Sequence, residues 1–190
     1  EQWNIPVTTS IEGKSAFPED HPLSLGSGGR ANSRPVKRYL EESDLILGLG
    51  VSFALTAFGV PMPPGKKIIH ATLDPMDLNK DVPADIGLIG DAKLTLAALN
   101  SELSNADNSK AAARADEPEK INPLKEEWMQ EWLPKLTNNE APINPYRVVA
   151  ELNRLVDKEK VVITHDAGSP RDQITPCLLY TSPSPRDSSP

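Results

Sequence analysis

The sequence predicts an α/β protein: a doubly wound parallel sheet, followed by a second α/β domain that is truncated. Between residues 1 and 104, short apolar runs alternate with stretches of helical periodicity. These runs show little apolar–polar alternation, as expected of strands that are buried on both faces of a parallel sheet. A new helix-then-strand pattern begins at residue 143 but stops after one repeat. A complete domain of this kind needs roughly a hundred residues or more, so the second domain is expected to be incomplete.

The first hundred residues are expected to contain the sheet. Strands are predicted at 5–9, 44–50, 67–74 and 86–90, and helices at 34–43 and 92–103. The segment 17–29 is rich in proline and glycine and is predicted to lack regular structure. Asp91 stands immediately before the second helix, where a capping side chain is expected. This order of strands and helices is typical of a doubly wound sheet.

Residues 105–142 are predicted to form a linker with one helix. The first part of this segment consists mainly of small and polar residues and offers nothing large to bury. Asn122 followed by Pro123 is typical of a helix start, with a capping residue and then proline at the first helical position. Trp128 and Trp132 fall on the apolar face of this helix, and we expect them to pack rather than to stack on a ligand.

Residues 143–176 are predicted to begin the second α/β domain. Asn144 and Pro145 repeat the helix-start pattern, and a strand is expected at 160–166. The periodicity then ends. Residues 177–190 are interpreted as an artefactual tail, translated from adapter or vector sequence, and a native low-complexity tail is the alternative.

Composition excludes several classes of function. A formal net charge of −7 argues against nucleic-acid binding, which requires a basic face toward the phosphate backbone. No apolar run approaches the roughly 18 residues of a membrane span. The single cysteine, Cys177, excludes an intramolecular disulfide and a cysteine-based zinc site. We therefore expect a cytoplasmic protein with no nucleic-acid or membrane partner.

The sequence begins at Glu1 without an initiator Met, so we expect a chain that has been cut at its N-terminus.

Three segments together resemble the acetolactate synthase-like family of thiamine-diphosphate enzymes. The first, 6–26, contains a Gly-Lys turn and a Pro, acid, His-Pro loop that leads to Leu-Gly. The second, 43–50, is an acid-aliphatic-Leu-Gly strand. The third, 73–92, follows an Asp-Pro, Asn-Lys, Gly-Asp-Ala path. A fourth stretch, 143–168, resembles the entry to the family's diphosphate-binding domain.

The resemblance implies a three-domain subunit with a Rossmann-like central domain at 1–104. The full-length parent is then expected to bind thiamine diphosphate and Mg²⁺ and to act on a 2-keto acid or a related acyl donor, as a transferase or lyase. It is expected to be a homodimer or homotetramer. The family's catalytic glutamate would precede Glu1, and its Gly-Asp-Gly … Asn magnesium motif would follow Gly168. No catalytic and no metal-binding residue is therefore assigned, and the fragment is predicted to be inactive.

The resemblance also implies a contact with the diphosphate of the thiamine cofactor. Asp166, Gly168 and Ser169 follow the last expected strand, at the edge where parallel sheets bind ligands. Pro170 stands where several relatives have a histidine, so a backbone contact is favoured over a side-chain contact at this point.

A second group of residues is the candidate site for a nucleotide such as FAD. Its members are Gly26, Gly28, Gly29 and Asp74. Glycines let a backbone approach a phosphate closely, and an acid at a strand end can bind a ribose hydroxyl. A flexible loop and a turn residue are the alternatives. FAD itself is doubtful, because the segment 51–55 lacks the acidic pair and the arginine of flavin-containing relatives. A free-standing nucleotide-binding or scaffolding domain without catalysis is the alternative function.

Overall fold

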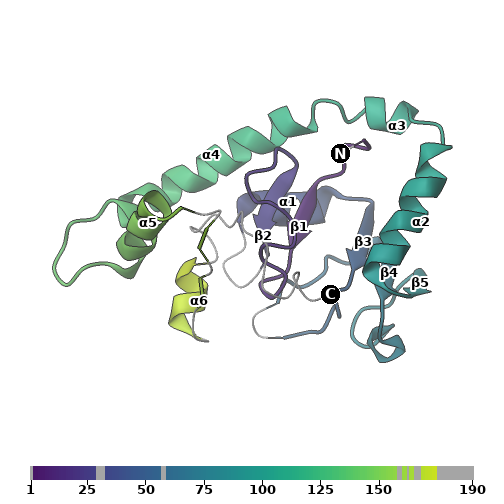
Figure 1. The fold of residues 1–190 in the computed structure, drawn as a ribbon, viewed down its shortest axis with the longest axis horizontal. Helices are drawn as coiled ribbons and strands as arrows, with labels where there is room; N and C mark the ends of the chain where they lie inside the picture. The colour runs from purple at the N-terminus through teal and green to yellow at the C-terminus, as the bar shows by residue number, and fades with distance from the viewer. Residues whose placement is uncertain are drawn as a thin grey trace.

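The computed structural model describes residues 2–28, 33–56, 59–157, 160–161, 163–164 and 168–174. Parallel strands with flanking helices occupy the chain up to residue 104, and the later described elements are helices; the parallel sheets with their helices confirm the predicted α/β class (Figure 1). The elements are β1 (Val7–Thr9), β2 (Ser24–Ser27), α1 (Arg34–Glu42), β3 (Leu45–Leu49), β4 (Lys67–Thr72), the short 3-10 helix η1 (Pro75–Asp77), β5 (Ile86–Ile89), α2 (Ala92–Ser104), α3 (Ser109–Ala112), α4 (Glu117–Leu136), α5 (Pro145–Leu155) and α6 (Ser169–Ile174).

All strand pairs are parallel, as predicted, but the strands form two sheets within the described residues. One sheet pairs β1 with β2, and the other has the order β3-β4-β5. In the larger sheet Leu47 pairs with Ile69, and Ile69 pairs with Ile86. Residues paired in this way share one face, so these three side chains form an apolar row across the sheet.

The segment 17–29 is not wholly irregular, contrary to the prediction, because it contains β2. Leu23 and Leu25 point into the core and are almost fully buried. The N–H of Val7 donates to the carbonyl of Leu23 (2.9 Å), which holds the start of β2 against β1. The burial of these two leucines stabilises a strand here, and this gain outweighs the preference of the surrounding residues for turns.

The expectation that β3 is buried on both faces is wrong for the described residues. Leu45 and Leu47 remain 47% and 41% exposed, whereas Gly48 on the opposite face is buried. The reason lies in the helices, since α2 comes after β5 and makes its main contact with the larger sheet at β4. One face of β3 is therefore left without a covering helix among the described elements.

The main core joins the first sheet to two helices. It consists of Leu23, Leu25, Val36 and Ile121, with Tyr39 and Leu40 packed against it. Ile121 belongs to α4 and is 0% exposed. This helix begins at Glu117 rather than at Asn122, so Pro123 lies inside it instead of at its start. The buried Ile121 extends the helix N-terminal to the proline, which offsets the lost backbone hydrogen bond.

The far end of α4 packs against α5 (Figure 1). The ring centroids of Trp128 and Trp132 are 5.5 Å apart, and those of Trp132 and Tyr146 are 4.9 Å apart. Lys135 Nζ lies 4.4 Å from the centroid of the Trp132 ring. The tryptophans thus pack within the protein, as predicted. The start of α5 is also as predicted, with the side chain of Asn144 accepting from the N–H of Tyr146 (3.0 Å).

The strand expected at 160–166 is wrong where the structure describes it. Residues 160–161 and 163–164 are not in a strand, and residues 165–167 lie outside the described residues. No described strand lies beside this segment to pair with it. A strand has no stable backbone partner on its own, so an apolar run alone does not form one.

Candidate functional site

Three parts of the chain bear on function: the carboxyl ends of β1 and β2, the carboxyl ends of β3 and β4, and the junction of α5 with α6. Carboxyl ends of parallel strands are the usual place for ligands in folds of this class.

A buried polar network lies at the carboxyl ends of β1 and β2. The hydroxyls of Thr9 and Ser27 are 3.0 Å apart, and Ser27 donates to Glu19 Oε1 (2.7 Å). Glu19 is only 4% exposed, and its carboxylate forms an ion pair with the Lys14 ammonium. A second lysine, Lys125 of α4, donates to the Glu19 carbonyl (3.1 Å). Burial lowers the pKa of Lys125. The network ties the loop after β1 to β2 and to α4.

The described glycines of the predicted nucleotide site have their N–H groups in internal hydrogen bonds. The N–H of Gly28 donates to the carbonyl of Thr9 (2.7 Å), and a Cβ at Gly28 would lie 2.9 Å from Val60 Cγ2. The N–H of Gly26 donates to Ser24 Oγ (3.2 Å), and Gly26 has a φ of +88°. Gly29 lies outside the described residues. Close packing and backbone conformation therefore account for the two described glycines without a ligand.

Asp74 and Asp91 both cap helices. Asp74 Oδ1 accepts the N–H of Met76 (2.9 Å) at the start of η1, and Asp74 is exposed. Asp91 Oδ1 accepts the N–H of Leu94 (3.0 Å) at the start of α2, which confirms its predicted role as a cap. The structure does not bring Asp74 into contact with Gly26 or Gly28 through any described hydrogen bond.

The carboxyl ends of β3 and β4 are closed by an aromatic contact that sequence reasoning did not find. His70 of β4 is 0% exposed, and its Nε2 lies 2.6 Å from the carbonyl oxygen of Val51. The Phe53 ring meets the His70 ring edge-on, with centroids 4.9 Å apart and the planes at 78°. His70 was assigned no role from sequence. Its alternation with the buried Ile68 and Thr72 is the signal that could have indicated an inward side chain.

Of the three residues predicted to contact a diphosphate, the structure describes the backbone of two. Gly168 has a φ of +96°, and a Cβ there would have no neighbour within 4 Å. Ser169 is the first residue of α6, and Asp166 lies outside the described residues. No group of three His, Cys, Asp or Glu side chains gathers anywhere in the described part of the chain. The described residues alone thus do not gather a set of such metal ligands.

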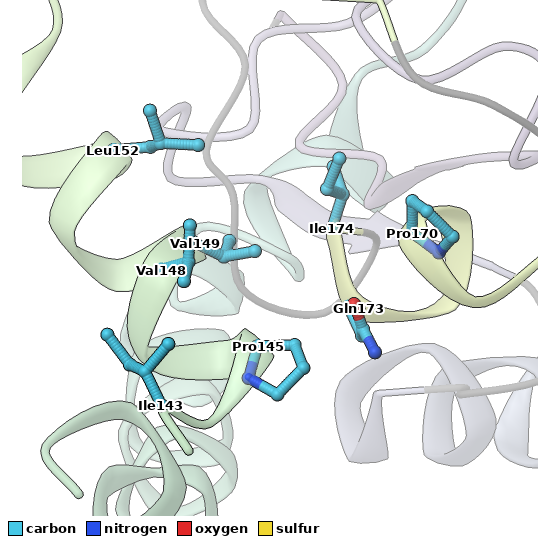
Figure 2. A pocket seen from close by; sticks show the side chains of 8 residues that line it. All are labelled: Ile143, Pro145, Val148, Val149, Leu152, Pro170, Gln173 and Ile174. Atoms are coloured by element: carbon cyan, nitrogen blue, oxygen red, sulfur yellow. The ribbon is translucent and has the colours of Figure 1, made fainter. Parts of the chain in front are cut away.

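An apolar groove of about 370 Å³ separates α5 from α6. Figure 2 shows its lining, in which Gln173 is the single polar side chain. The lining residues are Ile143, Pro145, Val148, Val149, Leu152, Pro170, Gln173 and Ile174. Such a lining suits apolar packing and offers no group for acid–base or metal chemistry.

Ion pairs fix α4 to α1 beside the core. Arg34 donates to Glu127 (2.7 Å) and also pairs with Glu131. The Tyr39 hydroxyl donates to Glu117 Oε2 (2.9 Å). Burial is the largest cause that raises the pKa of Tyr39 to about 12, and this hydrogen bond is the next.

Within the described ranges, no helix combines the length and apolarity that a membrane crossing requires.

Comparison with known proteins shows which protein family this chain matches. Residues 1–99 match the family model described as "Thiamine pyrophosphate enzyme, central domain". The probable acetolactate synthase large subunit of Methanococcus aeolicus is 30% identical, in an alignment that covers 98% of this chain and 32% of that protein. The corresponding protein of Methanocaldococcus jannaschii is 32% identical over 86% of this chain and 28% of its own length. Acetolactate synthase isozyme 3 large subunit of Escherichia coli is 29% identical, in an alignment that covers 98% of this chain and 32% of that protein. The chain therefore spans about a third of the length of these relatives.

Proposed function

Because this chain belongs to the thiamine pyrophosphate enzyme family, with residues 1–99 matching the central domain, we propose that it is part of an acetolactate synthase-like enzyme. The observation that carries this proposal is the share of the chain that the alignments cover. They cover 98% of the chain and so continue past the central domain into the region of α4 and α5. The same order of segments thus recurs in acetolactate synthase large subunits.

The parent enzyme is proposed to act on a 2-keto acid or a related acyl donor as a transferase or lyase. Thiamine diphosphate would supply the electron sink for making or breaking a carbon–carbon bond next to a carbonyl, with Mg²⁺ as its metal. Asp166, Gly168 and Ser169 are proposed to contact the diphosphate. The parent is further proposed to be a cytoplasmic homodimer or homotetramer.

The domain boundaries proposed for this chain follow the sequence pattern. Residues 1–104 are proposed to form the central domain, 105–142 a linker, and 143–176 the beginning of the diphosphate-binding domain. The linker contains two described helices, α3 and α4, rather than the one that the sequence predicted. Residues 177–190 are proposed to be an artefactual tail, although the alignments that cover 98% of the chain extend into these residues and do not support that part of the proposal. The position of α4 supports a linker between two domains: its residue Ile121 packs in the core of the central domain, and its other end contacts α5. This helix would set the spacing between the two domains.

Turnover measured with added thiamine diphosphate and Mg²⁺ tests the catalytic proposal. The full-length protein is expected to consume a 2-keto acid such as pyruvate, whereas the 190-residue chain is expected to consume none. The described residues do not provide a metal cluster, which is the reason for expecting no turnover by the chain alone. Turnover by the 190-residue chain, or none by a folded full-length protein with any 2-keto acid or acyl donor, would contradict the proposal.

The alternative function, a free-standing nucleotide-binding or scaffolding domain without catalysis, is not favoured by the similarity to acetolactate synthases. Between its two forms, one observation favours scaffolding over nucleotide binding. The N–H groups of Gly26 and Gly28 donate within the protein, so they are not free for a phosphate. Calorimetry with FAD and with ADP at millimolar concentration separates the two roles. No heat of binding is expected from either nucleotide, and saturable binding of FAD would instead support a nucleotide site at the glycines and Asp74.

A further inference from the structure

The segment 51–55 lies over the carboxyl ends of β3 and β4 and holds a strained residue. Phe53 has a φ of +51°, a left-handed conformation that is unfavourable for a bulky side chain. Such conformations persist only where the surroundings enforce them, and they concentrate in active sites, ligand clamps and switch regions. The contacts that enforce this one can be identified.

The Phe53 ring is seated directly on the backbone of β3. A Cβ at Gly48 would lie 2.4 Å from two carbons of that ring, so only glycine leaves room for it. His70 is the residue paired with Gly48 on the neighbouring strand β4, and its ring meets the Phe53 ring edge-on. Phe53 is almost fully buried, and this burial favours the closed position despite the strained backbone.

His70 also holds the segment through its backbone. A carbonyl oxygen can only accept, so the short contact between His70 Nε2 and the Val51 carbonyl requires the proton on Nε2. In the neutral ring Nδ1 then carries a lone pair, and this atom is buried with no hydrogen-bond partner among the described residues. An unsatisfied buried acceptor adds a cost to the closed position that opening to water would remove.

A second anchor lies at the other end of the segment. The N–H of Leu55 donates to Asp81 Oδ2 (2.9 Å), and both residues are exposed. Segment 51–55 is therefore held by one buried contact at Val51 and one exposed contact at Leu55, while Phe53 between them is strained. We propose that segment 51–55 is a lid that opens locally, with His70 as its latch. Opening exposes the carboxyl ends of β3 and β4, the edge at which parallel sheets accept ligands.

Amide hydrogen exchange of the full chain under native conditions tests the lid. The informative amides are Ala54 and Leu55, because both donate hydrogen bonds in the closed position. In His70→Phe the ring size is kept and the Nε2 donor is lost. Exchange at Ala54 and Leu55 is expected to accelerate about tenfold, the effect of losing one hydrogen bond, while amides of β4 and β5 keep their rates. His70→Gln, which keeps a donor, is expected to show a smaller acceleration.

Equal acceleration in the segment and in β4 and β5 would overturn the proposal, because it would mean that His70 only stabilises the whole fold. Unchanged exchange at Ala54 would overturn it as well. Asp81→Ala removes the exposed anchor without touching the core, so it provides a test if His70→Phe does not fold. This variant is expected to accelerate exchange at Ala54, and the matched control Asp81→Asn, which keeps an acceptor oxygen, is not.

Discussion

In the part of the chain that the structure describes, a charged side chain is buried only where it is paired. Glu19 is the clearest example, because its carboxylate lies beneath the loop after β1 and contacts both Lys14 and Ser27. Removing one partner of a buried ion pair leaves an uncompensated charge, which costs far more than losing an exposed pair. The closeness of Lys14 and Glu19 in sequence did not indicate this, because their burial depends on β2 and α4, which come later in the chain.

Lys14→Met is expected to lower the free energy of unfolding by about 3 kcal/mol, because it removes the ammonium group of a buried ion pair with Glu19. Urea denaturation followed by circular dichroism measures the change. Lys37→Met is the matched control, since Lys37 pairs with Glu41 on the exposed face of α1 and is expected to change stability by less than about 0.5 kcal/mol. Equal losses in the two variants would show that the Lys14 pair is not effectively buried.

Tyr39 is expected to make stability depend on alkaline pH. Its pKa is raised to about 12 in the folded chain by burial and by the hydrogen bond to Glu117. A raised pKa means that the folded state holds the proton more tightly than the unfolded state, whose pKa is about 10. The stabilisation is thus complete below pH 10 and is lost as the pH rises toward 12.

Because Tyr39 is partly exposed, solvent screening reduces the effect, and we expect a loss of about 1 kcal/mol. Urea denaturation at pH 9 and pH 11.5 measures it. Tyr39→Phe has no hydroxyl to titrate, so the difference between the two proteins isolates this group from the lysines. Parallel pH profiles for the two proteins would contradict the assignment.

At the scale of elements, helix starts were predictable from sequence where one local signal decided them. Asp91 and Asn144 cap α2 and α5 as expected. The start of α4 was not predictable from Pro123, because burial of Ile121 against a distant core extends the helix beyond it. Burial of Leu23 likewise places β2 in a segment that reads as a loop. Long-range packing determines where these elements begin, so local sequence signals did not predict them. The contact of His70 with Val51 depends on the same kind of long-range packing and could not be predicted from the sequence either.

Ile121→Ala is expected to detach α4 from the central core. Ile121 is the contribution of α4 to the cluster of Leu23, Leu25 and Val36, and its truncation leaves a cavity that costs about 3 kcal/mol. Urea denaturation measures the loss, and Trp128 and Trp132 on the same helix report on its position by fluorescence. Met129→Ala, on the more exposed side of α4, is the control and is expected to cost less than about 1 kcal/mol. Similar losses would mean that α4 is not anchored through Ile121.

At the scale of the whole molecule, the larger sheet leaves one apolar face uncovered among the described residues. Leu47 and Ile86 remain substantially exposed at the two ends of the row that runs through Ile69. Contiguous exposed apolar surface marks an interface, or a liability to associate when the interface partner is missing. The chain spans about a third of the length of its relatives, so the proposed parent enzyme would have room for such a partner segment.

Leu47→Lys is therefore expected to reduce self-association of the 190-residue chain, because it places a charge at one end of the apolar row on the uncovered face. Sedimentation velocity measures the fraction of monomer, and binding of an apolar dye measures the exposed surface. The monomer fraction is expected to rise and dye binding to fall. Met76→Lys adds the same charge on η1, away from the sheet, and is expected to change neither. An unchanged monomer fraction in a Leu47→Lys variant with native circular dichroism would show that another surface drives association, and the groove between α5 and α6 would be the next to test.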